Sequence, residues 1–461
     1  MSDRDWEGDR GPSFWLGQDE YLPAHPLNGR VRADVAVVGG GFTGLWTAIE
    51  LKERDPRLEV CLLEQEVVGY GASGRNGGFC EPSLTHGYAN GARHFPEEID
   101  ELERLGRDNF DGLLDFVERH RISCDLERPG VLEVATTPWQ VEGLRRELLD
   151  RSPRRPELQL LEGDAARSRL NSPRVLAALY DPVPALLNPA RLARGLRRVA
   201  EELGVRVWER TPVRRLRPLA GGVEVETPRG VATAQRAVLA TNAYSGQLLP
   251  RLRTRFVPVY DYVLVSEPLN REQRERIGWE RREGASEHSN HFHYFRLTAD
   301  DRILWGGYDA IYHFGGAVGP QFDHRPKTYT RLLEQFRQMF PALGDLAFTH
   351  RWGGAIASTT RFTCTFGSAL GGRVVYALGY TGLGVAATRF AGGVLAARLL
   401  EPTSPLLRLR LVRQPPFPFP PEPLRWPTLA AVQGAMSAAD RSGRRGLLLG
   451  ALDRLGIGFA S

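Results

Sequence analysis

A glycine-rich segment that follows an apolar run constrains the fold of this chain more than any other feature. Residues 33–38 are mostly valine and alanine, which is typical of a strand buried on both faces. Residues 39–44 follow at once with the spacing Gly-X-Gly-X-X-Gly, and residues 45–53 have the pattern of a helix. A second short apolar run, residues 59–63, comes next. This order predicts a β-α-β unit within about 32 residues.

Each glycine of the motif has its own physical role. Gly39 permits a tight turn, Gly41 lets the backbone approach a pyrophosphate, and Gly44 lets the helix pack closely on the strand. The helix N-terminus offers N–H groups and partial positive charge to phosphates. Glu64 lies 20 residues after Gly44, where a carboxylate can accept hydrogen bonds from both ribose hydroxyls. The segment therefore predicts a dinucleotide site, although the spacing does not separate NAD from FAD.

The remaining sequence indicates how the chain is divided. With 461 residues, two or three packed units of about 150 residues are expected. Residues 237–240 and 374–378 are further buried strands, whereas residues 251–345 alternate or are rich in aromatic side chains, which favours an antiparallel sheet. We therefore expect an α/β fold, α+β overall, in which a Rossmann-like nucleotide-binding domain is interrupted by an antiparallel-sheet substrate domain. The expected boundaries are 1–90, 185–250 and 346–400 for the first domain, 91–184 and 251–345 for the second, and 401–461 for a C-terminal tail with a short helix.

Composition excludes several classes of protein. The four cysteines contain no CxxC pair, which argues against a disulfide scaffold, a thiolate zinc site and an iron–sulfur cluster. No window is apolar and long enough for a membrane span, and residues 1–10 have no signal-peptide core, so we expect a cytoplasmic protein. The net charge of +5 comes from arginines spread along the chain, and no nucleic-acid-binding motif accompanies it.

A second glycine-rich loop, residues 71–78, follows Glu64 almost at once. An NAD domain has no need of this loop, whereas a flavin ring must lie flat on backbone. Together with the segments 240–244, 351–354 and 379–385, these motifs resemble the D-amino-acid-oxidase-like (DAO) family of FAD-dependent oxidoreductases, whose relatives include glycine oxidase and sarcosine oxidase. The γ-glutamylputrescine-oxidase-like branch is the most similar. The resemblance covers roughly residues 10–400.

The resemblance implies where FAD binds. Glu64 should hold the adenosine ribose, the loop at Ser73 should line the pyrophosphate and the flavin edge, and the backbone of Val213 should meet adenine. The segment at Gly382 should point a helix N-terminus at the flavin pyrimidine ring, where negative charge develops on reduction. The implied cofactor-binding residues are Gly39, Gly41, Phe42, Thr43, Gly44, Glu64, Gln65, Ser73, Arg75, Asn76, Gly77, Gly78, Val213, Thr241, Asn242, Gly382, Leu383, Gly384 and Val385.

The chain departs from the family at three positions. Ile356 stands where amino-acid oxidases of the family place an arginine that clamps the substrate carboxylate, which favours an amine or a longer substrate. The strand 302–305 has no lysine of the kind that promotes reaction with oxygen in some relatives, so the electron acceptor is oxygen or another molecule. Cys364 does not match the position of the covalent flavin link in sarcosine oxidases, which implies non-covalent FAD.

Candidates for the substrate face come from the aromatic-rich strands. An aromatic-walled pocket suits a cationic amine through cation–π attraction, although sheet packing explains the same residues. Arg296 offers either a charge for the substrate or a structural salt bridge. The histidines between 288 and 293 lack the spacing of a metal site, so no metal is expected. The substrate candidates are Tyr260, Tyr262, His291, His293, Tyr294 and Arg296.

The expected reaction is hydride removal from the carbon beside a neutral amine onto flavin N5, followed by hydrolysis of the imine. No side chain is assigned as acid or base, because the flavin performs the redox step. Two alternatives stay open at this point. One is an NAD-dependent Rossmann dehydrogenase, and the other is a non-catalytic flavin-binding protein for redox sensing or interaction, with the tail as a docking element.

Overall fold

The expected β-α-β unit is present in the computed structural model, which describes residues 12–458. β1 (Gly29–Val38) leads into α2 (Phe42–Arg54), and the chain returns in β2 (Val60–Leu63), parallel to β1. The last four residues of β1 and all of β2 are buried, which explains why both strands are almost continuously apolar.

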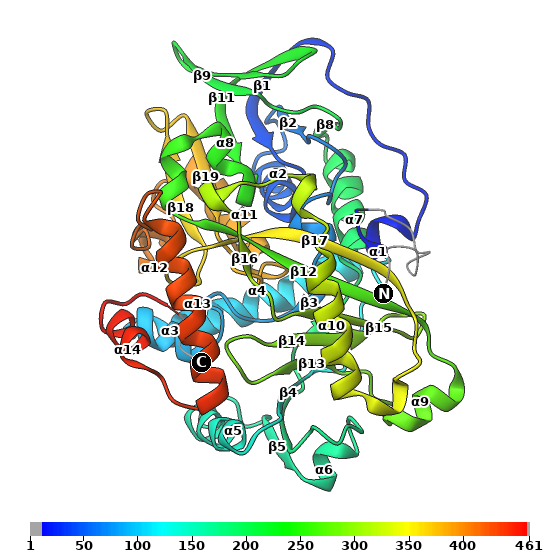
Figure 1. Ribbon diagram of the computed structural model, residues 1–461. Helices are drawn as coiled ribbons and strands as arrows, with labels where there is room; N and C mark the ends of the chain where they lie inside the picture. The colour runs from blue at the N-terminus through cyan, green and yellow to red at the C-terminus, as the bar shows by residue number, and fades with distance from the viewer. Residues whose placement is uncertain (1–11, 459–461) are drawn as a thin grey trace.

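The first sheet is built around these two strands in the order β18-β19-β11-β1-β2-β8 (Figure 1). All neighbours on this path are parallel except β18, an antiparallel edge strand. The strand expected at 237–240 is the end of a longer strand, β11, which begins at Gly230 and ends at Leu239. A hairpin of β9 and β10 extends the sheet beside β11. The bounds are β8 (Arg206–Trp208), β9 (Arg215–Leu219), β10 (Gly222–Glu226), β11 (Gly230–Leu239), β18 (Thr365–Ala369) and β19 (Val374–Leu378).

Helices cover one face of the first sheet. α2 packs against α11 (Ala387–Leu400) and α7 (Pro189–Glu202), and α4 (Ile99–Arg119) packs on α11. The start of α7 has two residues that favour a helix N-terminus: the Asn188 side chain accepts a hydrogen bond from the Arg191 N–H at 3.1 Å, and Pro189 occupies the first turn.

The second sheet lies across the other half of the molecule in the order β16-β12-β15-β14-β13-β4-β6-β5, with β17 on the free side of β12 (Figure 1). All its pairs are antiparallel except β13 with β4. Its apolar side chains share a core with the uncovered face of the first sheet. The bounds are β4 (Val131–Ala135), β5 (Gln159–Glu162), β6 (Ala177–Asp181), β12 (Val257–Pro268), β13 (Gly284–Glu287), β14 (His293–Leu297), β15 (Arg302–Gly307), β16 (Ile311–Tyr312) and β17 (Phe348–Ser358).

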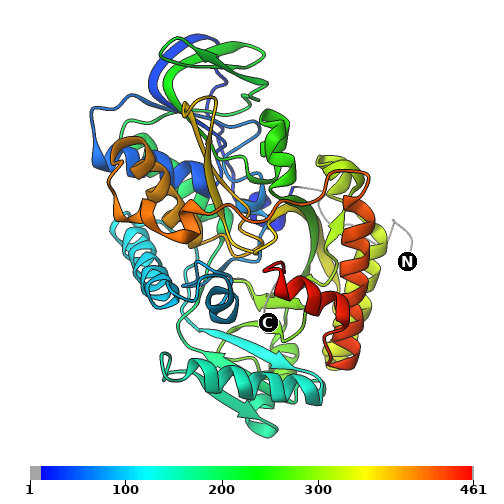
Figure 2. The same cartoon turned by 90° about the vertical axis from the view of Figure 1, so that its left-hand side faces the viewer.

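The C-terminal segment is more helical than expected. The short helix near 447–455 is present as α14 (Leu447–Arg454), but it is preceded by α13 (Arg425–Ser442), which has no clear apolar stripe and was not predicted. α13 runs beside the second sheet and α14 turns toward the middle of the molecule (Figure 2). The remaining elements are α1 (Phe14–Gly17), β3 (Phe79–Cys80), α3 (Tyr88–His94), α5 (Pro138–Arg151), α6 (Asp164–Arg167), β7 (Ala185–Leu186), α8 (Ser245–Leu248), α9 (Arg271–Ile277), α10 (Pro326–Met339) and α12 (Arg410–Arg413).

The two sheets divide one of the expected domain segments. β17 falls within 346–400, assigned to the nucleotide-binding domain, yet it pairs with β12 of the second sheet. That segment therefore serves both sheets, and the domain boundaries stay a prediction. Residues 1–11 and 459–461 lie outside the described residues. The first range contains the start of the segment 1–90 and the residues expected to lack a signal-peptide core. The second range contains the end of the segment 401–461. Between residues 12 and 458 no helix has the length and hydrophobicity needed to cross a membrane.

Gly44 is the position where the first turn of α2 meets β1. A side chain there would overlap the carbonyl oxygen of Gly39 and approach Val37, which confirms the expected close packing. We predict that Gly44→Ala lowers the free energy of unfolding by roughly 1–3 kcal/mol, because the helix must move away from the strand. Gly434→Ala in α13, where a Cβ meets nothing within 4 Å, should be neutral or slightly stabilising. Thermal denaturation of both variants checks this, and equal stability of the two would contradict it.

Candidate functional site

A cavity of about 1480 Å³ starts at the carboxyl ends of β1 and β2 and continues along the second sheet. Ligands of open α/β sheets bind at this edge, and the volume exceeds the ~1000 Å³ upper range of single-ligand pockets. The expected cofactor-binding residues that line the cavity are Gly39, Gly41, Phe42, Thr43, Glu64, Gln65, Ser73, Arg75, Asn76, Gly77, Val213, Thr241, Asn242, Gly382, Leu383, Gly384 and Val385. Two further expected residues, Gly44 and Gly78, do not line the cavity but lie in the two glycine-rich segments that do.

The N-terminus of α2 forms one wall with the second glycine loop. The Phe42 N–H donates to Ser73 Oγ at 2.9 Å, which joins the two loops that the sequence placed at the dinucleotide. A Cβ at Gly41 would lie 2.9 Å from the same oxygen, so a side chain there would collide with Ser73 and push the two loops apart. The first-turn N–H groups of α2 thus face a space that suits phosphate.

Glu64 sits at the end of β2 and faces the cavity. Its carboxylate accepts hydrogen bonds from the Gly40 N–H at 2.6 Å and the Glu66 N–H at 3.0 Å, which fix its orientation. Burial raises the pKa of Glu64 to about 7, with the backbone donors acting in the opposite direction. The side chain is therefore an oriented acceptor at the strand end, as ribose binding requires.

Arg75 ties the second glycine loop to the second sheet. Its Nη1 donates to Asp323 Oδ2 at 2.6 Å and to the Gly353 carbonyl of β17 at 2.8 Å. Within the loop, the Asn76 amide donates to the Ala72 carbonyl and accepts from the Gly78 N–H. These contacts hold the loop backbone rigidly beside β17, which is what a planar ring lying on the loop would need.

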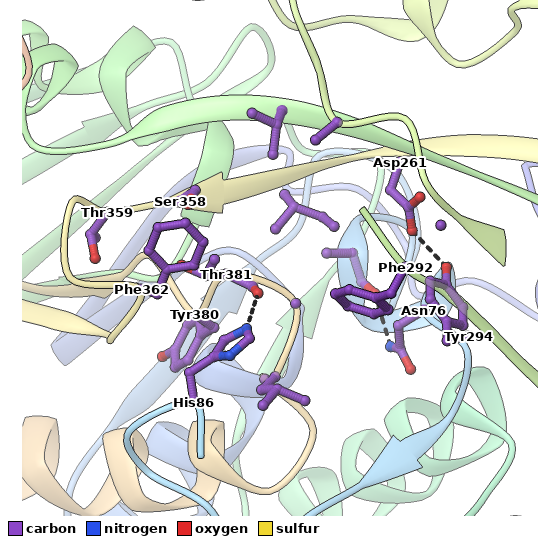
Figure 3. Close-up of a pocket in the computed structure, with 18 of the residues that line it drawn as sticks. Asn76, His86, Asp261, Phe292, Tyr294, Ser358, Thr359, Phe362, Tyr380 and Thr381 are labelled. Atoms are coloured by element: carbon purple, nitrogen blue, oxygen red, sulfur yellow. Dashed lines mark hydrogen bonds between the residues drawn. The ribbon is translucent and has the colours of Figure 1, made fainter. Parts of the chain in front are cut away.

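The segment 379–385 forms a third wall and contains a histidine contact that was not predicted. Thr381 has φ +51°, and its carbonyl accepts a hydrogen bond from His86 Nε2 at 2.9 Å (Figure 3). Burial lowers the pKa of His86, so the ring is neutral and carries its proton on the donating nitrogen. Asn242 Oδ1 accepts from the Gly379 N–H at 3.0 Å, and both contacts shape the approach to α11.

The substrate candidates divide between the cavity and the core. Tyr260, His291 and Tyr294 line the cavity. His293 does not, because side chains alternate along a strand and it points to the face opposite Tyr294, where it stacks on Trp305. It also pairs with Glu287 at 2.6 Å.

Arg296 and Tyr262 are also outside the cavity lining. Arg296 is buried and donates to the carbonyls of Leu187 and Leu297 at 2.9 and 3.0 Å, so it carries neither the substrate charge nor the salt bridge that were its two expected roles. The Tyr262 hydroxyl donates to the Phe322 carbonyl at 2.8 Å. Both side chains brace the second sheet.

Asp261 is a cavity residue that sequence reasoning missed. Its Oδ2 accepts a hydrogen bond from the Tyr294 hydroxyl at 2.6 Å (Figure 3). Its Oδ1 accepts one from the Tyr262 N–H at 2.8 Å. Burial raises the pKa of Asp261 to about 6. The sequence signal was an acid placed between two tyrosines in the largely apolar first half of the strand.

The far end of the cavity, at β4 and α5, is rich in carboxylates. Glu133, Glu147 and His288 place their ligand atoms within 4.8 Å of one another. The His288–Glu133 pair at 2.6 Å and the Arg151–Glu147 pair at 2.6 Å account for these charges. His291 pairs elsewhere, with Asp440, so the histidines between 288 and 293 do not converge on one point. This end of the cavity is therefore lined by charged groups that are paired with one another.

Comparisons with known sequences agree with this geometry. A family model described as FAD dependent oxidoreductase (DAO) matches residues 34–398. Gamma-glutamylputrescine oxidoreductase of Escherichia coli (strain K12) is 32% identical over 436 residues, which cover 92% of this chain and 97% of the relative. A probable oxidoreductase, OrdL, of Haemophilus influenzae is 28% identical over 398 residues, covering 83% and 86%.

Solved structures show the same fold. Glycine oxidase from Geobacillus kaustophilus matches with a TM-score of 0.67 at 21% identity, covering 80% of this chain and 94% of that chain. L-proline dehydrogenase from P. horikoshii matches with a TM-score of 0.65 at 18% identity, covering 84% and 96%. At these sequence identities the similarity supports a shared fold. The two structures confirm the expected combination of a parallel nucleotide-binding sheet and an antiparallel substrate sheet.

The Glu64 carboxylate is expected to bind the ribose of FAD, since it is the oriented acceptor at the strand end. We predict that Glu64→Gln weakens FAD binding by about 10- to 100-fold, because hydrogen bonds to a charged acceptor are replaced by weaker ones. Titration of apoprotein with FAD, followed by quenching of flavin fluorescence, measures the change. The control is Glu59→Gln, because Glu59 is exposed and lies immediately before β2. Equal losses in both variants would contradict the assignment.

The same carboxylate predicts a pH dependence of apoprotein stability. Burial raises the pKa of Glu64 from 4.5 to about 7 in the folded protein. Ionisation is therefore harder in the folded than in the unfolded chain, and the free energy of unfolding falls as the pH rises through this window. Denaturant titrations of wild type and Glu64→Gln across that pH range should show their stability difference shifting in favour of the glutamine variant. A difference independent of pH would refute the prediction.

Proposed function

Because the chain belongs to the DAO family of FAD-dependent oxidoreductases, which act on amines and amino acids, we propose that this protein oxidises the C–N bond of an amine. Family membership sets aside both alternatives that the sequence left open, an NAD-dependent dehydrogenase and a non-catalytic flavin-binding protein. When bound, FAD supplies a hydride acceptor at N5, and the resulting imine is hydrolysed by water. The described residues hold and orient the two reactants.

The observation that carries this proposal is the wall that β12 and β17 form beside the second glycine loop. Ile356 lines the cavity from β17, where an arginine clamp for an α-carboxylate would stand. Arg75 lines the cavity too, but its guanidinium is engaged by Asp323 and Gly353. Asp261, by contrast, offers a carboxylate to the cavity. A cation is therefore favoured over a free α-carboxylate at this wall.

Two further observations support an amine of some length. The cavity continues past Tyr294 to the paired charged groups at β4 and α5, which leaves room for a longer substrate with a polar end. The gamma-glutamylputrescine oxidoreductase of Escherichia coli, at 32% identity, is named for a long amine. The aromatic rings of Tyr260 and Phe292 add cation–π surface to the wall.

Anaerobic bleaching of the holoprotein tests the proposal. We expect n-butylamine, benzylamine or 1,4-diaminobutane to reduce the flavin at least about 10-fold faster than alanine or proline, because a carboxylate beside Ile356 would be left without a charged partner. Absorbance of the oxidised flavin is the readout, and free FAD is the blank. Faster reduction by the α-amino acids would contradict the proposal. Oxygen uptake with an active amine then separates oxidase from dehydrogenase.

A further inference from the structure

Among the described residues, Asp261 differs from the nearby carboxylates Asp323 and Asp309 in having no cationic partner. In the part of the chain that the structure describes, its hydrogen-bond donors are the Tyr294 hydroxyl and backbone N–H groups. Two other carboxylates of the same wall each have an arginine at 2.6 Å, in the pairs Asp323–Arg75 and Asp309–Arg331, and Glu287 is hydrogen-bonded to His293 Nδ1 at 2.6 Å. A carboxylate inside a protein usually acquires a counter-charge, so the missing cation at Asp261 points to a ligand.

The register of the second sheet builds this site. Val263 of β12 and Tyr294 of β14 both pair with Gly306 of the intervening β15. A Cβ at Gly306 would lie 2.7 Å from the Tyr294 hydroxyl, so the missing side chain lets the tyrosine ring cross β15 and reach Asp261. Tyr294 also lies against Gly77 of the second glycine loop. The Asp261–Tyr294 pair therefore lies where the second sheet meets the loop expected to hold the flavin (Figure 3).

From this arrangement we propose that Asp261 is the proton acceptor for the substrate ammonium, with Tyr294 as the residue that positions it. The inference rests on the proposed function and adds a catalytic role to it. An amine enters as R–CH2–NH3+, and one proton passes from nitrogen to Asp261 Oδ, which leaves R–CH2–NH2 with a free lone pair. Only this neutral form can release hydride from carbon and become the iminium R–CH=NH2+. The hydride and its electron pair go to FAD, and the proton stays on Asp261.

The surroundings of Asp261 set its proton affinity. Tyr260 and Tyr262 flank it on β12, and Tyr294 faces it from β14. Asp309, which follows β15, is the nearby negative charge and is itself paired with Arg331. On β17 the register partner of Asp261 is Gly354, which carries no charge. Burial raises the pKa of Asp261 to about 6, so the carboxylate is ionised and ready to accept a proton at neutral pH.

The pH profile of Asp261→Asn gives the sharpest test. Wild type should show kcat/KM rising through a pKa near 6 and then staying level up to the pKa of the amine. The asparagine variant must select the neutral amine from solution, so its kcat/KM should rise about tenfold per pH unit until the pKa of an alkylamine, ~10.4. Near pH 7.4 the kcat/KM of the variant should therefore lie about 1000-fold below its own maximum, and most of that difference is recovered near pH 10. Recovery at high pH also shows that the variant is folded.

Two variants separate acceptance of the proton from a structural role. Tyr294→Phe removes the donor that stabilises the carboxylate, so its acidic limb should move to higher pH while a level region remains. Asp300→Asn, in the β14–β15 hairpin and exposed, should keep the wild-type profile. A wild-type profile for Asp261→Asn, or one lowered equally at every pH, would overturn the proposal.

Calorimetry supplies a readout that does not depend on turnover. tert-Butylamine has no hydrogen on the carbon beside nitrogen and cannot be oxidised, so its binding to the holoprotein is measured in two buffers of different ionisation enthalpy. Wild type should bind it with no proton released to buffer, and Asp261→Asn should release about one proton per amine bound near neutral pH. Proton release by wild type, or the absence of binding by wild type, would overturn the ammonium site. Failure of every amine to bleach the flavin at both pH values would instead reject the proposed function.

Discussion

The close approach of α2 to β1 is the constraint on which the rest of the molecule depends. Gly44 has no room for a side chain beneath Gly39, so the helix lies tightly against the strand and its N-terminus opens at the sheet edge. Ser73 then joins the second glycine loop to this N-terminus. Arg75 carries the connection on to β17 of the other sheet. The cavity is thus fixed by a short series of contacts between backbone and side chains, without a covalent link.

This arrangement explains how one cavity meets two different chemical demands. At the first sheet the walls are backbone N–H groups, glycines and the oriented carboxylate of Glu64, which suit phosphates and ribose. At the second sheet the walls are tyrosines, Ile356 and Asp261, which suit an organic cation. The reacting atoms would meet where the second glycine loop lies beside β14 and β17. The fold separates cofactor from substrate by assigning each to its own sheet.

The sequence predicted the parts of this architecture that local patterns encode. The β-α-β unit follows from its apolar runs and glycine spacing, and the antiparallel sheet follows from the alternating and aromatic-rich segments between 251 and 345. The DAO resemblance and the FAD cofactor followed from the order of several motifs. β17 was missed because its pairing with β12 joins segments about 90 residues apart, and α13 was missed because it lacks an apolar stripe.

The substrate side was harder to predict for a physical reason. Whether a strand residue faces the cavity depends on register, and a shift of one residue moves a side chain to the other face. His293 and Tyr294 illustrate this, since one packs on Trp305 and the other lines the cavity. Asp261 could not be predicted as a site residue, because its hydrogen bond with Tyr294 depends on the missing side chain of Gly306 in the intervening strand β15.

A crystal structure of the FAD-loaded protein with tert-butylamine tests the central account most directly. The account predicts ribose hydroxyls on the Glu64 carboxylate, the flavin ring between the second glycine loop and Ile356, and the amine nitrogen within hydrogen-bonding distance of Asp261. A flavin bound elsewhere in the cavity, or an amine directed away from Asp261, would contradict it.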